Sequence, residues 1–156
     1  MNQLHLNPKP SEQQKLDLIA RHVAAESAHD MAGTLATLHP DCVFEDTAMG
    51  RVWRGHEGAK AHYLEWWNGL DAEVASENRS GWLPDGSFIA ETGFCCRHIG
   101  TFLDIPATGN KFRLSFVVVV SFRDGLMLGE RFYYSLDSLL LKLGTARRAP
   151  YAGEVV

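Results

Sequence analysis

The stretch over residues 111–122 constrains this chain most, because its residues alternate strictly between two faces. A period of two, rich in β-branched and aromatic residues, is typical of a half-buried strand. The chain must therefore build a sheet whose apolar face packs against other elements. That face consists of Phe112, Leu114, Phe116, Val118, Val120 and Phe122, and the opposite one of Arg113, Ser115, Val117, Val119 and Ser121.

Three more strands are predicted around this one. Arg123-Asp124-Gly125 predicts a hairpin turn into a strand over 126–135, in which the orientation of Glu130 and Tyr133 stays open. A further strand is predicted over 72–83, ended by Pro84-Asp85-Gly86. Residues 87–98 also alternate. Their more apolar face is placed inward and consists of Phe88, Ala90, Thr92, Phe94, Cys96 and His98.

Before residue 71 the pattern is mostly helical. Ser11 and Gln14 match a capping box, and apolar residues then recur at helical spacing to about residue 28. Further helices are predicted over 31–38 and 55–69, with a short strand at 41–47 and an extended piece at 51–54 between them. Pro40 disfavours helix at the residue before it. A closing helix is predicted over 137–143, ended by Gly144.

Helices that come first and strands that come later predict an α+β fold. We expect a curved, mostly antiparallel sheet wrapped around the N-terminal helices, as a cone-shaped barrel with an interior pocket. At 156 residues the chain is expected to hold one domain over 11–144. Residues 1–10 and 145–156 are predicted to be tails.

Composition excludes several classes of protein. A net charge of −4, without a Lys/Arg stripe, argues against nucleic-acid binding. No apolar run approaches the roughly 20 residues that cross a bilayer, and the start lacks the apolar core of a signal peptide. Three cysteines, two of them adjacent, favour reduced thiols and a cytoplasmic location. No metal or cofactor is expected, because histidine pairs lack ligand spacing and no Gly-rich phosphate loop occurs.

The candidate catalytic residues are Asp46, His22 and His98. Asp46 ends its short strand on the same face as Phe44, His22 borders the apolar stripe of the first helix, and His98 ends an inward face. We predict that the three converge inside the cone, where desolvation raises the pKa of a carboxyl and suits it to abstract a proton next to a carbonyl. Two alternatives stay open for Asp46: a solvated strand-end carboxylate that caps a loop, and a buried structural pair with His22.

Several segments resemble the nuclear transport factor 2-like superfamily. They are residues 21–25 (RHVAA), residues 34–46 (TLATLHPDCVFED), and Arg54-Gly55 followed by a helix. Residues 97–102 (RHIGTF), 105–109 (IPATG), 123–126 (RDGL), 129–134 (GERFYY) and 139–144 (LLLKLG) resemble its SnoaL-type polyketide cyclase branch. The resemblance spans about residues 12–144 and implies the cone fold.

The chain is also similar to ketosteroid isomerase, which has an Asp base and an oxyanion site made of a Tyr and a second Asp. The resemblance places that base on Asp46 and that Tyr on His22. The second acid falls at about Val118, close to where SnoaL-type cyclases carry their catalytic acid. The chain therefore departs from both groups at this position.

Together these features favour a protein that binds a small hydrophobic carbonyl compound in its cone. The first expectation is a cofactor-independent isomerase or cyclase that uses Asp46 as its general base. The alternative is a non-catalytic ligand-binding or protein-interaction module of the same fold. The residues expected to contact the ligand are Phe44, Tyr63, Trp67, Phe94, Phe116, Val118 and Phe132.

The outer face of the 111–122 strand predicts a partner. Val117 and Val119 lie there between two serines, and a modest apolar patch with a polar rim is typical of an interaction site. The predicted helices cover only one side of the sheet, and relatives of this fold commonly pair sheet against sheet. We therefore predict a two-fold homodimer through Val117 and Val119.

Overall fold

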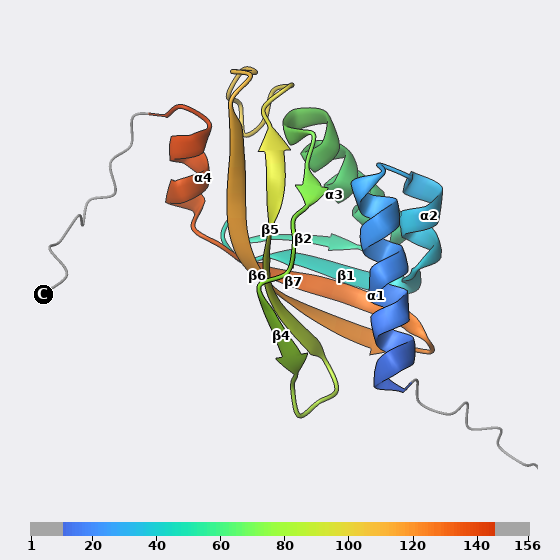
Figure 1. The fold of residues 1–156 in the computed structure, drawn as a ribbon. Helices are drawn as coiled ribbons and strands as arrows, with labels where there is room; N and C mark the ends of the chain where they lie inside the picture. The colour runs from blue at the N-terminus through green and yellow to red at the C-terminus, as the bar shows by residue number, and fades with distance from the viewer. Residues whose placement is uncertain (1–10, 146–156) are drawn as a thin grey trace, which may run out of the picture.

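The computed structural model describes residues 11–145. Its elements, in chain order, are α1 (Glu12–Ser27), α2 (Met31–Ala36), β1 (Leu38–Asp46), β2 (Arg51–Arg54), α3 (Gly55–Leu70), β3 (Glu73–Val74), β4 (Arg79–Trp82), β5 (Phe88–Arg97), β6 (Lys111–Arg123), β7 (Leu126–Tyr133) and α4 (Leu136–Lys142). Figure 1 shows α1, α2 and α3 gathered on one side of the sheet. The predicted α+β class is confirmed. The predicted tails lie outside the described residues, apart from Thr145.

Side-chain caps start the N-terminal helices. Ser11 Oγ accepts a hydrogen bond from the Gln14 amide while Gln14 Oε1 accepts one from the Ser11 amide, so the predicted capping box is confirmed. Asp30 caps α2 by accepting from the Gly33 amide. α3 ends at Asp71, which adopts a left-handed φ of 45°. These contacts set where α1 and α2 begin and where α3 ends.

The strands form one open, curved sheet in the order β2-β1-β7-β6-β5-β3, with β4 also paired to β5. All pairs are antiparallel except β1 with β7. The ladder between β5 and β6 runs from Phe88 opposite Val120 to Arg97 opposite Lys111. At Gly93 the strands approach so closely that a Cβ atom would lie 2.5 Å from the Leu114 carbonyl oxygen.

The inward face of the sheet carries the core. All six residues predicted to face inward on 87–98 are buried, as are the four central apolar residues of β6: Leu114, Phe116, Val118 and Val120. The predicted alternation of both strands is therefore confirmed. The buried aromatic residues of α3, which are Tyr63, Trp66 and Trp67, complete this core. Burying one large apolar side chain stabilises a fold by roughly 1.5–3 kcal/mol, so this layer holds the helices to the sheet.

Three predicted boundaries differ clearly from the structure. The strand predicted to begin at residue 41 begins at Leu38 and ends at Asp46, as β1. The strand predicted over 72–83 is two short strands, β3 and β4. The intervening segment still donates hydrogen bonds to β5, from Ala75 N to Gly93 O and from Asn78 N to Glu91 O. α2 ends at Ala36, before the predicted residue 38, because pairing with β7 takes over there: the amide of Met127 donates to the Thr37 carbonyl. Within residues 11–145, no helix is long and apolar enough to cross a membrane.

Candidate functional site

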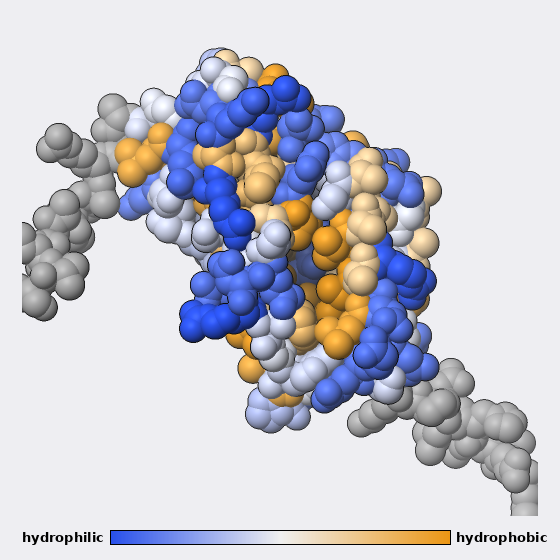
Figure 2. All heavy atoms as spheres, viewed as in Figure 1, coloured by the Kyte–Doolittle hydropathy of each residue, from blue (hydrophilic) through white to orange (hydrophobic). Residues whose placement is uncertain are grey.

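A cavity of about 500 Å³ lies between α1 and the inward face of the sheet. Its walls are α1, the segment 74–77, and inward residues of β5, β6 and β7. Figure 2 shows apolar residues gathered in a hollow beside α1. Four phenylalanines make the lining strongly aromatic: Phe88, Phe94, Phe116 and Phe132. Its size and apolar character are those of a small-molecule site.

Three buried titratable side chains face this apolar cavity: His22 and Glu26 from α1, and Glu130 from β7. His22 and Glu26 are four residues apart, so they share one face of the helix. His22 Nε2 lies 3.6 Å from Glu26 Oε2 and 3.8 Å from Glu130 Oε1. Two carboxyls from distant parts of the chain therefore gather at one ring nitrogen.

Glu130 faces the cavity because β7 contains a bulge. An unbroken ladder from the Asp124-Gly125 turn would set Glu130 opposite Val119, which faces outward. In the structure Leu128 is an extra residue, and Glu130 lies opposite the inward-facing Val120. Beyond the bulge, each side chain of β7 therefore points to the opposite face from the one that an unbroken ladder would give. As a result, the carboxyl of Glu130 faces the cavity.

Gly129 allows this bulge. Its φ is 146°, a conformation that residues with a side chain rarely adopt. A Cβ atom at this position would also collide with the carbonyl oxygen of Val43 on β1. The close approach of β1 to β7 therefore requires glycine here.

The neighbours of His22 hold it in one tautomer. Thr37 Oγ1 donates its only proton to the Thr34 carbonyl at 2.6 Å, so it accepts from His22 Nδ1–H at 2.7 Å. Nε2 then carries the lone pair and accepts from the Tyr63 hydroxyl at 3.1 Å. Burial lowers the pKa of His22 to about 4, so the ring brings no positive charge to the carboxyls at pH 7.

The buried, apolar surroundings of Glu26 and Glu130 disfavour the ionised form of both carboxyls. Burial raises the pKa of Glu130 to about 8. Burial, and then the charge of Glu130, raise the pKa of Glu26 well above its ordinary value. Among residues 11–145, no group donates a hydrogen bond to either carboxyl. At neutral pH the pair retains a proton, which it can give up or exchange with a ligand.

Asp46 lies elsewhere. It is buried, as its alternation predicted, but it does not line the cavity. Its Oδ1 accepts from the Met49 amide at 2.8 Å and its Oδ2 from the Tyr134 hydroxyl at 2.7 Å. The predicted convergence with His22 inside the cavity must therefore be corrected, because Asp46 lies outside the lining and contacts Met49 and Tyr134 instead. Of the two alternatives, the geometry fits the strand-end cap of the following loop, except that Asp46 is buried and not solvated.

His98 is fully buried just beyond β5, as predicted, and it too lies outside the cavity lining. Its Nδ1 lies 2.9 Å from Thr108 Oγ1 and accepts from the Thr108 amide at 3.3 Å, while its backbone amide donates to Asn110. These bonds fasten the loop before β6 to the end of β5. Of the three predicted catalytic residues, only His22 lines the cavity, and a catalytic role for Asp46 or His98 stays a prediction.

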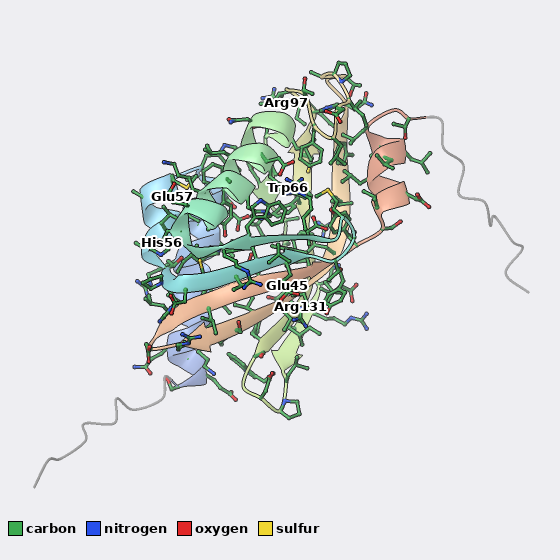
Figure 3. All side chains as sticks on the ribbon, turned by 180° about the vertical axis from the view of Figure 1, so that it is seen from behind. Glu45, His56, Glu57, Trp66, Arg97 and Arg131 are labelled. Carbon is green, nitrogen blue, oxygen red and sulfur yellow. The ribbon has the colours of Figure 1, made fainter. Side chains whose placement is uncertain are left out.

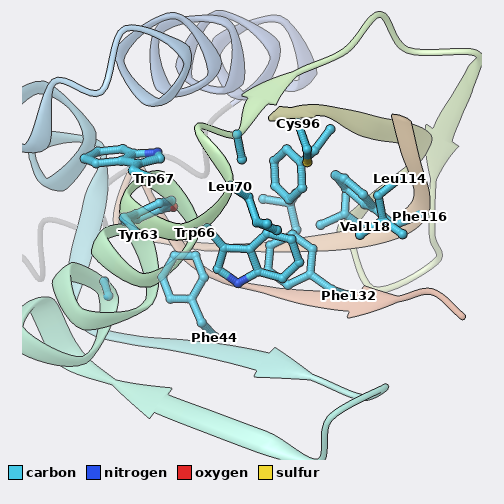
Figure 4. Packing of buried hydrophobic residues seen from close by; sticks show 14 of the residues in the cluster. Phe44, Tyr63, Trp66, Trp67, Leu70, Cys96, Leu114, Phe116, Val118 and Phe132 are labelled. Atoms are coloured by element: carbon cyan, nitrogen blue, oxygen red, sulfur yellow. The ribbon is translucent and has the colours of Figure 1, made fainter. Parts of the chain in front are cut away.

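Four of the residues predicted to contact a ligand do line the cavity: Phe94, Phe116, Val118 and Phe132. The other three do not: Phe44, Tyr63 and Trp67. Those three belong to the aromatic core shown in Figure 4, where the Tyr63 ring stacks on Trp67 with centroids 5.4 Å apart and meets Phe44 edge-on at 5.6 Å. Tyr63 reaches the site only from behind, through its hydrogen bond to His22.

Sequence reasoning missed Glu26 and left Glu130 open. The available signal for Glu26 was its spacing, four residues after His22 and three after Val23, which places it on the inward side of α1. The signal for Glu130 was its spacing of two from Phe132 on a strand. Both signals are weak, because Glu is almost never fully buried without a partner.

The fold and the cavity define a class: α+β proteins in which helices and an open, curved sheet enclose a ligand-sized space. Residues 19–129 match the family model of the SnoaL-like domain, and the chain belongs to this family. The resemblance predicted from the sequence is thereby confirmed.

Solved structures share this fold. A candidate polyketide cyclase from Xanthomonas campestris pv. campestris is 17% identical with a TM-score of 0.75, over 84% of this chain and 97% of that chain. TsrD from Streptomyces laurentii is 25% identical with a TM-score of 0.73, over 87% and 98%. A protein with a ketosteroid isomerase-like fold from Catenulispora acidiphila, in complex with trimethylamine, is 16% identical with a TM-score of 0.68, over 82% and 92%. The first and third likenesses show the fold alone. No curated protein matches the chain.

Proposed function

We propose that this SnoaL-like protein binds a small, largely hydrophobic carbonyl compound in the cavity beside α1 and moves a proton on it without a cofactor, as an isomerase or a cyclase does. One observation carries the proposal: Glu26 and Glu130 are buried in an apolar cavity and accept no hydrogen bond from residues 11–145. Carboxyls whose pKa values approach neutrality can act both as general acid and as general base.

The pair supplies both partners of such a proton transfer. The ionised carboxyl takes the proton from the carbon next to the carbonyl, and the electron pair of that C–H bond forms the C=C bond of an enol. The protonated carboxyl gives its proton to the carbonyl oxygen. Return of a proton to another carbon gives an isomer, and attack of the enol carbon on a second carbonyl of the same ligand gives a ring.

The proposal replaces the predicted base, Asp46, with Glu26 and Glu130, because both oxygens of Asp46 already accept hydrogen bonds. Two structural neighbours support a small organic ligand: one is named as a candidate polyketide cyclase, and one was solved with trimethylamine. The four phenylalanines of the lining support a hydrophobic body for that ligand.

Exchange of the α-protons of 2-tetralone, a compact hydrophobic ketone, tests this proposal. In D₂O the wild-type chain should exchange these protons faster than buffer, as followed by proton NMR. Glu130→Gln should lose most of the enhancement, on the order of 10²-fold or more, because an amide neither takes nor gives the proton.

The matched control is Glu57→Gln. Glu57 is an exposed carboxyl on α3, labelled in Figure 3, and its loss should leave exchange unchanged. Saturable binding of 2-tetralone without exchange by the wild-type chain would contradict an enzyme and leave the alternative, a non-catalytic ligand-binding module.

We also propose that two chains pair through the outer face of the sheet around Val117 and Val119. Both are only partly buried within one chain, and β6 places them between β5 and β7 on the side away from the cavity. Polar groups surround them, such as the Glu45–Arg131 ion pair at 3.0 Å between β1 and β7 (Figure 3). A stable interface of this kind buries on the order of 1,600 Å² in total.

A further inference from the structure

We infer that the ligand of the cavity beside α1 carries a basic nitrogen, bound as an ammonium group between the carboxyls of Glu26 and Glu130. This inference rests on the site that the proposed function uses. It concerns the chemical class that the site binds, whereas the proposed function concerns the proton that it moves.

The first argument is the sign of the charge around the cavity. Glu26, Glu77 and Glu130 line it, and its lining residues within the described part of the chain include no Lys or Arg. His22 is neutral at pH 7, because burial lowers its pKa to about 4. A carboxylate or phosphate would therefore be desolvated among like charges with no compensating cation. The cavity excludes anionic ligands.

The second argument is what the two carboxyls lack. Glu26 is 6% exposed and Glu130 is 9% exposed, yet neither accepts a hydrogen bond from residues 11–145. A ketone oxygen has only lone pairs to offer, so it can accept a hydrogen bond from a protonated carboxyl but cannot donate one to an ionised carboxylate. An ammonium group carries several N–H donors, which form stronger, charge-assisted hydrogen bonds to carboxylates.

The two acids are neighbours, because a carboxyl oxygen of each lies within 4 Å of the same nitrogen, His22 Nε2. A cation at this place also offsets the repulsion between two buried carboxylates, which otherwise makes their ionisation unfavourable. The site is therefore better matched to a cationic head than to a neutral one.

The third argument is the aromatic lining. Phe88, Phe94, Phe116 and Phe132 line the same cavity as the acids. The faces of aromatic rings attract cations within about 6 Å, and their apolar surface suits the body of a hydrophobic amine. An acidic end and an aromatic wall together describe a ligand with a cationic head on a hydrophobic skeleton.

Binding of such a ligand must change the protonation of the pair. Burial raises the pKa of Cys42 on β1 and of Tyr63 on α3 and lowers that of His22 on α1, so these neighbours stay uncharged near pH 7. Glu77, at the exposed edge of the lining, is the remaining acid. An arriving ammonium favours the ionised carboxyls, so uptake of the amine should release a proton into solution.

Three probes on one bicyclic skeleton test the inference with the wild-type chain: 2-aminotetralin as the ammonium, 2-tetralone as the neutral compound, and tetralin-2-carboxylate as the anion. In titration calorimetry at pH 7 the amine should bind at least about tenfold more tightly than the ketone, and the carboxylate least tightly. The heat of amine binding should depend on the ionisation enthalpy of the buffer, which reports the released proton.

Variants then locate the site. Glu26→Gln and Glu130→Gln should each narrow the gap between amine and ketone, whereas Glu57→Gln should preserve it. The inference is overturned by equal affinity for amine and ketone, by tighter binding of the carboxylate, by binding of none of the probes at millimolar concentration, or by a gap that both cavity variants retain. The wild-type series decides even where a variant fails to fold.

The two proposals fail separately. Exchange of 2-tetralone without a preference for the amine leaves the proton-transfer function standing and removes this inference. A preference for the amine without any exchange of the ketone supports this inference and removes the proton-transfer function.

Discussion

Asp46 and the pair Glu26 and Glu130 are buried acids in one small protein, yet their surroundings are opposite. Asp46 is 1% exposed, and each of its oxygens accepts a hydrogen bond from within the chain. Glu26 and Glu130 are almost as deeply buried, but they face an apolar cavity and receive no hydrogen bond from the described residues. Burial alone does not separate the two cases. A buried acid whose acceptors are filled holds structure, whereas one whose acceptors are empty points to a ligand.

The largest effect on stability is expected from a substitution at Gly129, whose backbone conformation turns Glu130 toward the cavity. Gly129→Ala would press a methyl group against the Val43 carbonyl at a φ of 146°. We expect the free energy of unfolding to fall by at least about 3 kcal/mol, because β1 and β7 must separate. Urea denaturation followed by tryptophan fluorescence measures it.

Gly125→Ala is the control for that change. Gly125 also has a positive φ, of 77°, but a Cβ atom there meets nothing within 4 Å, so the expected loss is only about 1–2 kcal/mol. Equal losses in the two variants would contradict the steric role of Gly129.

The second prediction concerns the satisfied acid. Asp46→Ala removes the acceptor of both the Met49 amide and the Tyr134 hydroxyl. We expect the free energy of unfolding to fall by about 3 kcal/mol, because hydrogen bonds to a charged group contribute about 1.5–3 kcal/mol each. Tyr134→Phe removes one of the two bonds and should lose about half as much in the same denaturation experiment. A stable Asp46→Asn variant without activity would instead support the predicted catalytic role.

The third prediction concerns how the free energy of unfolding changes with pH when Glu130 is present or removed. The pKa values of Glu26 and Glu130 are raised in the folded chain, so between about pH 4.5 and 8 the folded state binds more protons than the unfolded state. The free energy of unfolding contributed by these groups therefore falls as pH rises through that window. Glu130→Gln removes one of them and should be more stable than wild type at pH 8, by about 1–3 kcal/mol, with little difference at pH 4.5.

Denaturant unfolding at a series of pH values measures this difference. His22, whose pKa is lowered to about 4, makes both chains lose stability as pH falls from about 6.5 toward 4, and this term cancels in the comparison. Glu57→Gln should keep the wild-type pH slope. The same slope in Glu130→Gln would mean that Glu130 titrates as an ordinary surface acid.

The smallest effect on the fold is expected on the far side of the sheet. Val119→Asp should change the free energy of unfolding of one chain by less than about 1 kcal/mol, yet it should split the proposed dimer by placing charge in a desolvated centre. Light scattering measures the mass. Val52→Asp, on the edge strand β2 where Val52 is 51% exposed, should leave a dimer intact. A wild-type mass of one chain, or a dimeric Val119→Asp variant, places the interface elsewhere or removes it.

Much of the fold could be predicted because in β5 and β6 every second residue faces the core along the whole strand. Every inward residue from Phe88 to Cys96 and from Leu114 to Val120 is buried, so local pattern and final burial agree on that face. The capping box at Ser11 is likewise local and was predictable. The end of α2 was less so, because it depends on pairing with β7, distant in the sequence.

The candidate site was harder to predict, because it depends on contacts that local patterns do not encode. The burial of Asp46 followed from alternation, but its partner Tyr134 is 88 residues away. Glu26 lies on the inward side of α1, where a Glu ordinarily indicates a solvated edge. Glu130 changes face at a bulge that depends on Gly129 and on the approach of Val43 from β1.

The bulge at Leu128 also has a consequence for how the chain folds. A β6–β7 hairpin that grows from its turn has a simpler register available, in which Arg131 lies opposite the inward-facing Val118 and Glu130 faces out. Local hairpins form before distant strands dock, because closing a longer loop loses more entropy. We therefore expect the hairpin to sample both registers until β1 arrives, when Glu45 pairs with Arg131 on the outer face and Val43 closes over Gly129. Docking of β1 is then the folding step that selects the register and commits the acid, and not the arginine, to the interior.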